Sequence, residues 1–387
     1  MSGLYIHIPF CKSRCIYCGF YSTTLLSLQD RYVDALCREL ELRLASQQLP
    51  LSTIYLGGGT PSQLSAKNLQ KLVGKISLLA PQSSLLEITM ECNPDDVTEQ
   101  FAKELQMLPV NRVSMGVQTF CNDRLRFLHR RHTAEQIPTA IERLRKAGIM
   151  NISIDLMFGF PGETMDEWQT DISKALEMDV EHISAYCLMY EEGTPLYERL
   201  KIKDERLKIV DEETERLMYD ILIDRLTAAG YEHYEISNFA KTAYHPFNNQ
   251  QPSSYRSLHN SNYWNGTYYI GVGAAAHSYY EERGTLYRSW NVADLHAYME
   301  SIERGVVPCE RETINDDTHY NDIITTALRT SEGISLSSLQ PKYRHYLLDN
   351  ARTSLRNGLL AIDNEHIHLT RQGLFVSDDV MSDLIWL

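Results

Sequence analysis

Six strand-like runs alternate with helix-like runs over the first half of the chain, and this alternation is the feature that most restricts the fold. The expected strands are residues 4–8, 53–56, 86–90, 112–117, 151–156 and 182–188. The intervening helices are expected near residues 28–46, 66–79, 98–108, 122–128, 134–147 and 165–178. Such repeats predict a parallel sheet with right-handed crossovers. Six units are too few for a closed eight-fold barrel, so we expect an α/β fold built on an open, partial (β/α)6 TIM-like barrel.

Residue types that can carry chemistry fall where these strands end. Three cysteines follow the first strand and three glycines follow the second. Glu91, Gln118 and Asp155 lie at or near the ends of the next three strands. In parallel α/β folds the functional site lies at the carboxyl ends of the strands. We therefore expect these residues to line one site.

Cys11, Cys15 and Cys18 have the spacing C-x3-C-x2-C directly after the first strand. Thiolates this close in sequence can bind one iron–sulfur cluster. Three cysteine ligands on a four-iron cluster leave one iron open to a substrate or cofactor. A structural zinc site is the alternative, but it requires four closed ligands, and no fourth cysteine or histidine is adjacent. We therefore predict that these three cysteines hold a [4Fe-4S] cluster.

The other five cysteines are scattered through expected helices and strands, and we expect them to be structural. They are Cys37, Cys92, Cys121, Cys187 and Cys309. This usage is typical of a metal site in a reducing compartment and not of a disulfide framework. No secretory segment precedes the first strand, and no apolar run is long enough to span a bilayer. We therefore expect a cytoplasmic protein that associates with a membrane only through a partner.

The composition narrows the classes of partner. The formal net charge of -14 argues against a basic face for nucleic acid, so no nucleic-acid partner is expected.

Helices near residues 320–329 and 343–357, a hairpin around residues 363–364 and a final helix indicate a small winged-helix-like α+β domain. This part of the chain also carries more acidic than basic residues, which disfavours DNA binding.

Three domains are expected. Residues 1–234 form the partial barrel and include a long helix near residues 205–229. Residues 235–309 form an aromatic-rich connecting segment, irregular up to about residue 290. Residues 310–387 form the C-terminal winged-helix-like domain.

The three-cysteine motif resembles that of the radical S-adenosylmethionine (SAM) superfamily. In that family, SAM chelates the open iron through its amino and carboxylate groups, and the reduced cluster cleaves SAM to a 5′-deoxyadenosyl radical. The resemblance implies that Tyr17, just before the third cysteine, contacts the adenine. It also implies that Gly58, Gly59 and Thr60, which alone indicate only a tight turn, bind the amino group of SAM.

Longer segments narrow the resemblance to one subfamily, and the likeness covers nearly the whole chain. Residues 5–11, 57–61, 111–118 and 155–162 are similar to the subfamily that contains oxygen-independent coproporphyrinogen III oxidase and a branch of heme chaperones.

By that likeness further residues bind SAM, at one site or at two: Tyr5, Glu91, Gln118, Arg130 and Asp155. A structural role is the alternative for Gln118, Arg130 and Asp155, and capping of the following turn at Pro94 is the alternative for Glu91. His129 departs from the family, in which a glycine is frequent before the arginine.

Two features separate the branches of this subfamily. The oxidase has a further cysteine two residues after the third, where this chain has Phe20. The chaperone branch has an H-N-x-x-Y-W motif, which residues 259–264 match. The resemblance implies that its histidine, asparagine and aromatic residues bind heme: His259, Asn260, Tyr263 and Trp264. Imidazole is a common axial ligand of heme iron, whereas a loop packed by aromatic side chains is the alternative.

The function implied by the resemblance is that of a heme chaperone. Its cofactors are a [4Fe-4S] cluster and SAM, its cargo is heme, and it delivers heme to an acceptor protein. The alternatives are a coproporphyrinogen III oxidase and an iron–sulfur protein without radical chemistry. The sequence does not show which protein accepts the heme, whether heme is attached covalently or whether SAM is cleaved. It also leaves the oligomeric state open, and a homodimer is compatible with it.

Overall fold

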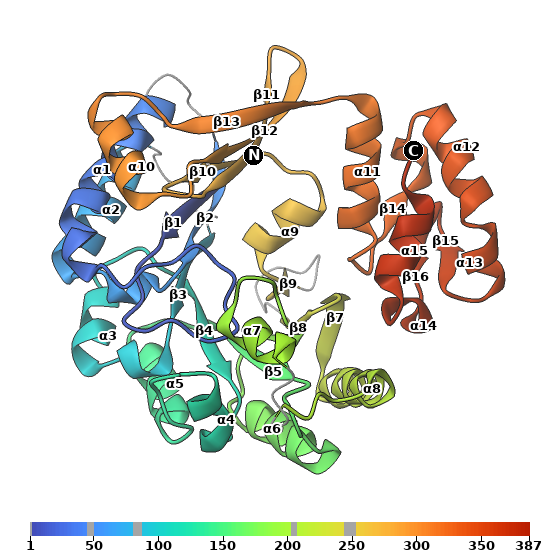
Figure 1. Cartoon of the computed structure of the whole chain (residues 1–387), viewed down its shortest axis with the longest axis horizontal. Helices are drawn as coiled ribbons and strands as arrows, with labels where there is room; N and C mark the ends of the chain where they lie inside the picture. Colours follow the sequence, from blue (N-terminus) through green and yellow to red (C-terminus); the bar gives the residue numbers. More distant parts are fainter. Residues whose placement is uncertain (1, 45–49, 80–86, 203–206, 244–252) are drawn as a thin grey trace.

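One large sheet organises the chain, which the computed structural model describes at residues 2–44, 50–79, 87–202, 207–243 and 253–387 (Figure 1). Its first six strands pair in chain order and are parallel. They are β1 (Ser2–Ile8), β2 (Leu51–Gly58), β3 (Glu87–Cys92), β4 (Arg112–Gln118), β5 (Asn151–Phe158) and β6 (His182–Cys187). The predicted parallel α/β barrel sheet is confirmed.

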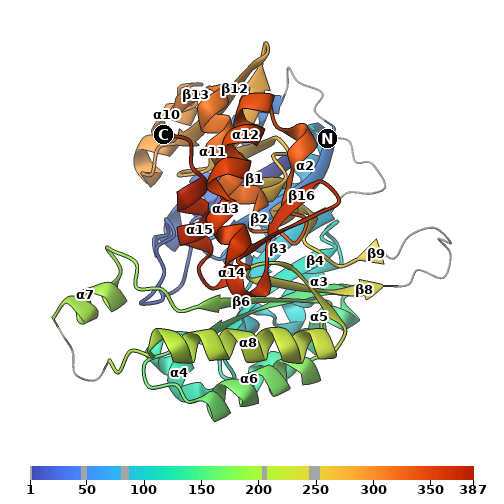
Figure 2. The same ribbon diagram turned by 90° about the vertical axis from the view of Figure 1, so that its right-hand side faces the viewer.

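The crossover helices cover the outer face of the sheet (Figure 1). They are α1 (Gln29–Leu44), α2 (Ala66–Leu79), α3 (Glu99–Leu105), α4 (Asn122–Phe127), α5 (Gln136–Lys146) and α6 (Met165–Glu177). Further on, α7 (Pro195–Lys201) and α8 (Glu212–Ala228) follow β6. Helices α6 and α8 run side by side along the outer face, where the Trp168 indole donates a hydrogen bond to the Met218 carbonyl at 2.9 Å (Figure 2).

Two expectations about the middle of the chain are wrong. The long helix begins at Glu212 and not near residue 205, with Asp211 as its N-cap. The segment expected to be irregular contains regular elements: β8 (Asn238–Ala243), β9 (Ser253–Ser254), α9 (Leu258–Trp264), β10 (Tyr269–Val272), β11 (His277–Glu282) and β12 (Thr285–Asn291). Residues 244–252 of this segment lie outside the described residues.

These elements extend the sheet on both sides. Strand β10 pairs in parallel with β1, and β11, β12 and β13 (Cys309–Ile314) continue outward from it as antiparallel strands. On the other side, β8 pairs antiparallel with β6, followed by β7 (Tyr231–Glu235). Helix α10 (Leu295–Glu303) lies between β12 and β13 in the chain.

The two faces of strand β4 differ in polarity. In β4, Val113, Met115 and Val117 are buried beneath the helices, while alternate residues from Arg112 to Gln118 lie on the inner face. Buried parallel strands usually read as continuous apolar runs. The polar side chains on the inner face of β4 depart from this pattern. They indicate that the barrel interior holds a ligand or internal polar contacts.

The C-terminal part has its own apolar core and a three-stranded sheet in the order β14-β16-β15. Its elements are α11 (Asp316–Ala327), β14 (Ile334–Ser335), α12 (Pro341–Asn350), α13 (Arg352–Arg356), β15 (Leu360–Asp363), β16 (His366–Leu369), α14 (Arg371–Leu374) and α15 (Ser377–Leu384). The predicted hairpin is present, and positive φ angles at Asn364 and Glu365 form its turn.

Helices long and apolar enough to cross a membrane do not occur in the part of the chain that the structure describes.

Candidate cofactor pocket and aromatic cavity

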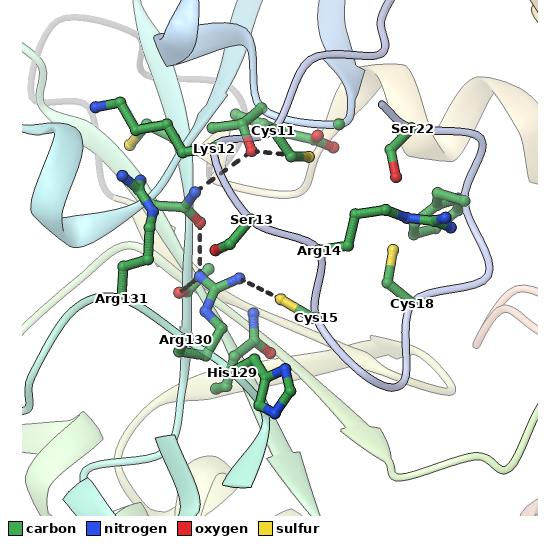
Figure 3. Close-up of a pocket in the computed structure, with 18 of the residues that line it drawn as sticks. Cys11, Lys12, Ser13, Arg14, Cys15, Cys18, Ser22, His129, Arg130 and Arg131 are labelled. Carbon is green, nitrogen blue, oxygen red and sulfur yellow. Dashed lines mark hydrogen bonds between the residues drawn. The ribbon is translucent and has the colours of Figure 1, made fainter. Parts of the chain in front are cut away.

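The three cysteines lie around one pocket at the carboxyl end of the barrel strands, which we call the cysteine pocket (Figure 3). Its volume is about 170 Å³. Eight residues predicted to bind SAM also line it: Tyr17, Gly58, Gly59, Thr60, Glu91, Gln118, Arg130 and Asp155. Tyr5 does not line it, and its hydroxyl oxygen lies 3.0 Å from His7 Nδ1. Five different strands thus contribute, directly or through the loops after them, to one site.

Hydrogen bonds within the loop and to residues that follow β2 and α4 position the loop that carries the cysteines. The Cys11 amide donates to the Thr23 carbonyl at 2.9 Å, and the Cys11 Sγ is 3.4 Å from the Thr60 hydroxyl. Arg130 donates to the Cys15 Sγ at 3.6 Å (Figure 3). Phe20 lies at the rim and is 70% exposed. The three sulfurs therefore face a pocket that two glycines, a threonine and an arginine complete.

Steric constraints at the end of β2 require glycine at residues 58 and 59. Gly58 has a φ of +109°, a backbone conformation that L-residues rarely adopt. A Cβ on Gly59 would lie 2.7 Å from the Pro9 carbonyl carbon, within the backbone that leads to Cys11. Any side chain at residue 59 would therefore push against the cysteine loop.

Glu91 and Asp155 are the two carboxyl groups on the inner wall of the pocket. Glu91 accepts hydrogen bonds from the Tyr55 hydroxyl at 2.8 Å and the Gly58 amide at 3.0 Å. Burial raises the pKa of Glu91 to about 7, and burial raises the pKa of Asp155 to about 6. Glu91 is therefore close to its protonation midpoint at neutral pH, whereas Asp155 is mostly ionised.

Gln118 and Arg130 reach the pocket through unusual backbone geometry. Gln118 has a φ of 67°, and the register of β4 against β5 shifts there, as in a β-bulge. His129 has a φ of 61°, in the left-handed region, which is the conformation that glycine adopts most readily. The next residue, Arg130, donates to Asn93 Oδ1 at 2.6 Å and to the Gly116 carbonyl. Although this chain has histidine where the family frequently has glycine, Arg130 still lies in the pocket.

Helix α9 carries the H-N-x-x-Y-W motif and lies on the concave side of the sheet (Figure 1). The Glu87 carboxylate accepts hydrogen bonds from the first amides of this helix, at Leu258 (3.2 Å) and His259 (3.0 Å). His259 is only 1% exposed, and both of its ring nitrogens have partners. Its Nδ1 is 2.8 Å from the Thr53 hydroxyl, and its Nε2 is 2.9 Å from the Tyr263 hydroxyl.

A second cavity, of about 920 Å³, lies between the end of α9, strands β10 to β12 and helix α11. We call it the aromatic cavity, because Tyr263, Trp264, Tyr268, Tyr269 and Tyr279 line it. His259 and Asn260 are not among its lining residues. The structure therefore separates the four predicted heme residues into two that line the cavity and two that lie behind it.

Comparisons with known proteins identify the family to which this chain belongs. The family model of the radical SAM superfamily matches residues 5–175, and that of the HemN C-terminal domain matches residues 314–376. The chain is 36% identical to the heme chaperone HemW of Bacillus subtilis, with 98% of each chain covered. It is 33% identical to the heme chaperone HemW of Lactococcus lactis, covering 99% of this chain and 97% of the relative. This chain belongs to the HemW family of radical SAM proteins.

A solved structure confirms the fold. The coproporphyrinogen III oxidase HemN from Escherichia coli matches this structure with a TM-score of 0.82 at 21% identity, covering 99% of this chain and 89% of that one. The predicted radical SAM barrel with its C-terminal domain is therefore correct. A radical SAM fold implies a [4Fe-4S] cluster and SAM as cofactors.

The cysteine pocket fits a cluster better than a single metal ion. All eight cysteines are free thiols. Within the described ranges, no three His, Cys, Asp or Glu side chains converge closely enough to hold one ion. A zinc ion binds all its thiolates at about 2.3 Å, whereas a four-iron cluster binds each cysteine at a different iron. Three separated thiols around one pocket therefore suit the cluster that the HemW family fold implies.

Burial raises the pKa of Cys11, and burial raises the pKa of Cys18 to about 11. Because iron binds the thiolate, loading the cluster must displace protons from these groups. The hydrogen bond with the Thr60 hydroxyl and the guanidinium groups of Arg130 and Arg14 oppose this shift, but the pKa of Cys11 stays raised.

Replacing Glu91 with glutamine is expected to change how stability depends on pH. The folded-state pKa of Glu91, about 7, lies above its ordinary value of 4.5. The folded protein then binds more protons than the unfolded chain between these values, so the contribution of Glu91 is complete below pH 4.5 and is lost as the pH rises through 7. The full shift corresponds to about 3 kcal/mol, which solvent contact in the pocket reduces to about 2 kcal/mol.

Urea unfolding of the unloaded wild type and of Glu91→Gln at pH 5 and pH 8 measures this effect. We expect the free energy of unfolding of the wild type to fall relative to that of the variant over this range. An identical pH dependence in both proteins would contradict it.

Three neighbours of the predicted residues were missed from the sequence. Tyr55 bonds to Glu91, the Ser114 hydroxyl donates to Asp155 at 3.2 Å, and Asn93 bonds to Arg130. Tyr55 lies two residues before Gly57, and Ser114 lies two before Gly116, so each shares the inner face of its strand. Alternation along the strands was the signal that could have found Tyr55 and Ser114.

Proposed function

We propose that this protein binds heme and transfers it to an acceptor protein, using a [4Fe-4S] cluster and SAM as cofactors. The observation that carries the proposal is the aromatic cavity, which the motif residues Tyr263 and Trp264 help to form. Large aromatic faces are suited to packing against a flat macrocycle. The HemW relatives, which match nearly the whole chain, are named heme chaperones, and this agrees with the assignment.

Cys11, Cys15 and Cys18 would hold the cluster, and its open iron would bind SAM. When bound, the reduced cluster supplies an electron that can cleave SAM. The backbone at Gly58 and Gly59, which line the pocket, would form a cradle that positions SAM around this iron. The remaining contacts would come from Tyr17, Thr60, Glu91, Gln118, Arg130 and Asp155, which line the same pocket. Tyr5 does not line the pocket, so it would affect SAM binding only indirectly, through its contact with His7.

A chain of contacts joins the two cavities. The Tyr263 hydroxyl meets His259 Nε2, and the His259 ring stacks on Tyr55 at 5.0 Å between centroids. The Tyr55 hydroxyl in turn donates to Glu91, which lines the cysteine pocket. SAM binding at Glu91 would thus be transmitted to a wall of the aromatic cavity, which is a physical route by which SAM could gate heme release.

Heme titration of the reconstituted protein tests the function. We expect a saturable Soret shift, and transfer of this heme to an apo-hemoprotein that reports binding by its own spectrum. Repeating the titration with SAM present tests the gating. Absence of heme binding would contradict the proposal. Turnover of coproporphyrinogen III would also contradict it, in favour of the oxidase activity.

A further inference from the structure

Trp264, the last residue of the H-N-x-x-Y-W motif, lines the aromatic cavity without a hydrogen bond to fix its ring. Its Nε1 is buried and has no hydrogen-bond partner among the described residues. A tryptophan with a buried N–H usually donates it to a partner, and that bond sets the orientation of the ring. Packing against a neighbouring group must therefore hold the Trp264 ring in the wall of the cavity.

Arg329 of the C-terminal domain is that neighbouring group. It follows helix α11, which faces α9 (Figure 1). The central carbon of its guanidinium group lies 5.0 Å from the centre of the Trp264 ring. Cations are attracted to the face of an aromatic ring, and tryptophan is the best partner for this contact. Arg329 does not itself line the aromatic cavity, so it would act on a ligand there through the Trp264 ring and not by direct contact.

The barrel fixes the Arg329 side chain from another direction. Glu235, the last residue of β7, is only 2% exposed. Its Oε1 accepts a hydrogen bond from Arg329 Nε at 3.1 Å and lies 3.0 Å from Arg329 Nη2. Its Oε2 accepts from the Ser237 amide at 3.0 Å and from the Asn238 side chain. The carboxylate is therefore held at both oxygens, and two guanidinium nitrogens meet it, which limits the orientations open to the arginine.

Backbone hydrogen bonds bring the arginine to this place. The Ile236 amide donates to the Arg329 carbonyl at 3.0 Å, and the Ser331 amide donates to the Tyr234 carbonyl at 3.0 Å. These bonds flank an antiparallel bridge between the two segments. The chain after α11 thus pairs with the end of β7. Docking of the C-terminal domain on the barrel and the position of Arg329 are therefore set by the same contacts.

We infer that Arg329 is a positioning residue for the heme motif, because it joins the Trp264 ring to the Glu235 carboxylate of the barrel and so holds the ring as a wall for the macrocycle. This inference rests on the proposed function. Heme binding would then depend on docking of the C-terminal domain, since the arginine comes from that domain and the ring that it holds does not.

A double-mutant cycle measured by hemin titration of the full, reconstituted chain tests the inference. We expect Arg329→Met to bind hemin about fivefold more weakly than the wild type, within the range that a cation–π contact gives. Arg329→Lys should recover part of this loss, because an ammonium group is also attracted to the indole face. In a Trp264→Ala chain, Arg329→Met should have no further effect. A residue with only a structural role would weaken hemin binding in both backgrounds.

Arg371→Met is the matched control. Arg371 lies on α14 of the C-terminal domain, forms ion pairs with Asp220 and Asp224 on α8 of the barrel, and does not line the aromatic cavity. The substitution thus removes a contact between the same two domains by the same chemical change. It should bind hemin like the wild type.

Hemin affinity equal to that of the wild type in Arg329→Met, or an equal loss in Arg371→Met, would overturn the inference while leaving the heme-binding function in place. A full effect of Arg329→Met in the Trp264→Ala chain would also overturn it. A wild-type chain that binds no hemin would overturn the proposed function as well. Circular dichroism verifies the fold of each variant. If Arg329→Met does not fold, the same cycle with Glu235→Gln, which weakens the hold on the guanidinium group, decides the question.

Discussion

Replacing Cys15 with alanine is expected to abolish the iron–sulfur cluster while leaving the chain folded. Cys15 lies in the loop after β1, outside the apolar core, and its sulfur contacts the Arg130 guanidinium. Each cysteine would hold one iron of the cube, so two remaining thiolates cannot retain it. After anaerobic reconstitution we expect iron to fall from about four atoms per chain to nearly none.

The loss should extend to SAM. The open iron provides the chelating contact for SAM, so Cys15→Ala should weaken SAM binding by at least tenfold in equilibrium dialysis. Cys309→Ala is the matched control, because Cys309 is an exposed free thiol on β13 and does not line the cysteine pocket. Its iron content and SAM affinity should equal those of the wild type. Stoichiometric zinc in place of iron, or a full cluster in Cys15→Ala, would disprove the cluster assignment.

The second large effect is expected from a single methyl group at residue 59. In Gly59→Ala the new Cβ would meet the Pro9 carbonyl carbon at 2.7 Å and the Ile8 oxygen at 2.9 Å. Both contacts are to backbone, which cannot rotate away, so β1 or the loop after β2 must shift. Overpacking of this kind costs about 1–3 kcal/mol. The same shift displaces the cradle from the cysteine loop, and SAM affinity should fall at least tenfold.

Gly74→Ala is the matched control, because it makes the same chemical change inside α2 where nothing lies within 4 Å of the new Cβ. Alanine is favoured over glycine in a helix by about 1 kcal/mol, so this variant should be more stable than the wild type. Urea unfolding and SAM titration of both variants measure the contrast. The same substitution is thus expected to destabilise the protein at residue 59 and to stabilise it at residue 74. A Gly59→Ala protein as stable as Gly74→Ala, with normal SAM binding, would refute the steric argument.

Local features of the sequence were sufficient for the barrel and for most of the cysteine pocket. Alternation of strands and helices predicted all six parallel strands within a few residues, because each strand and its crossover helix is a local unit. The rule that parallel strands end at one edge then placed Glu91, Gln118 and Asp155 beside the cysteines. Backbone strain at Gln118 and His129 was not visible, since either residue can adopt ordinary helix or strand conformations.

The extension of the sheet could not be predicted in the same way. Strand β10 is only four residues long and pairs with β1, more than 260 positions earlier in the chain. Its pattern carries too little periodicity to separate a short buried strand from a loop. The partner that makes it a strand is supplied by the completed barrel, so the segment around it seemed irregular from sequence alone.

The sequence by itself determined the chemistry: three cysteines at cluster spacing, the glycine cradle, the carboxyl groups at strand ends and the H-N-x-x-Y-W motif. These depend on spacing within a few residues and on the period of strands and helices, which are local properties. Only the tertiary structure decided how these groups are held. It paired both nitrogens of His259 with Thr53 and Tyr263, and it brought Arg329 of the C-terminal domain against the ring of Trp264. Hydrogen-bond satisfaction and the packing of one domain against another arise only once distant segments are assembled.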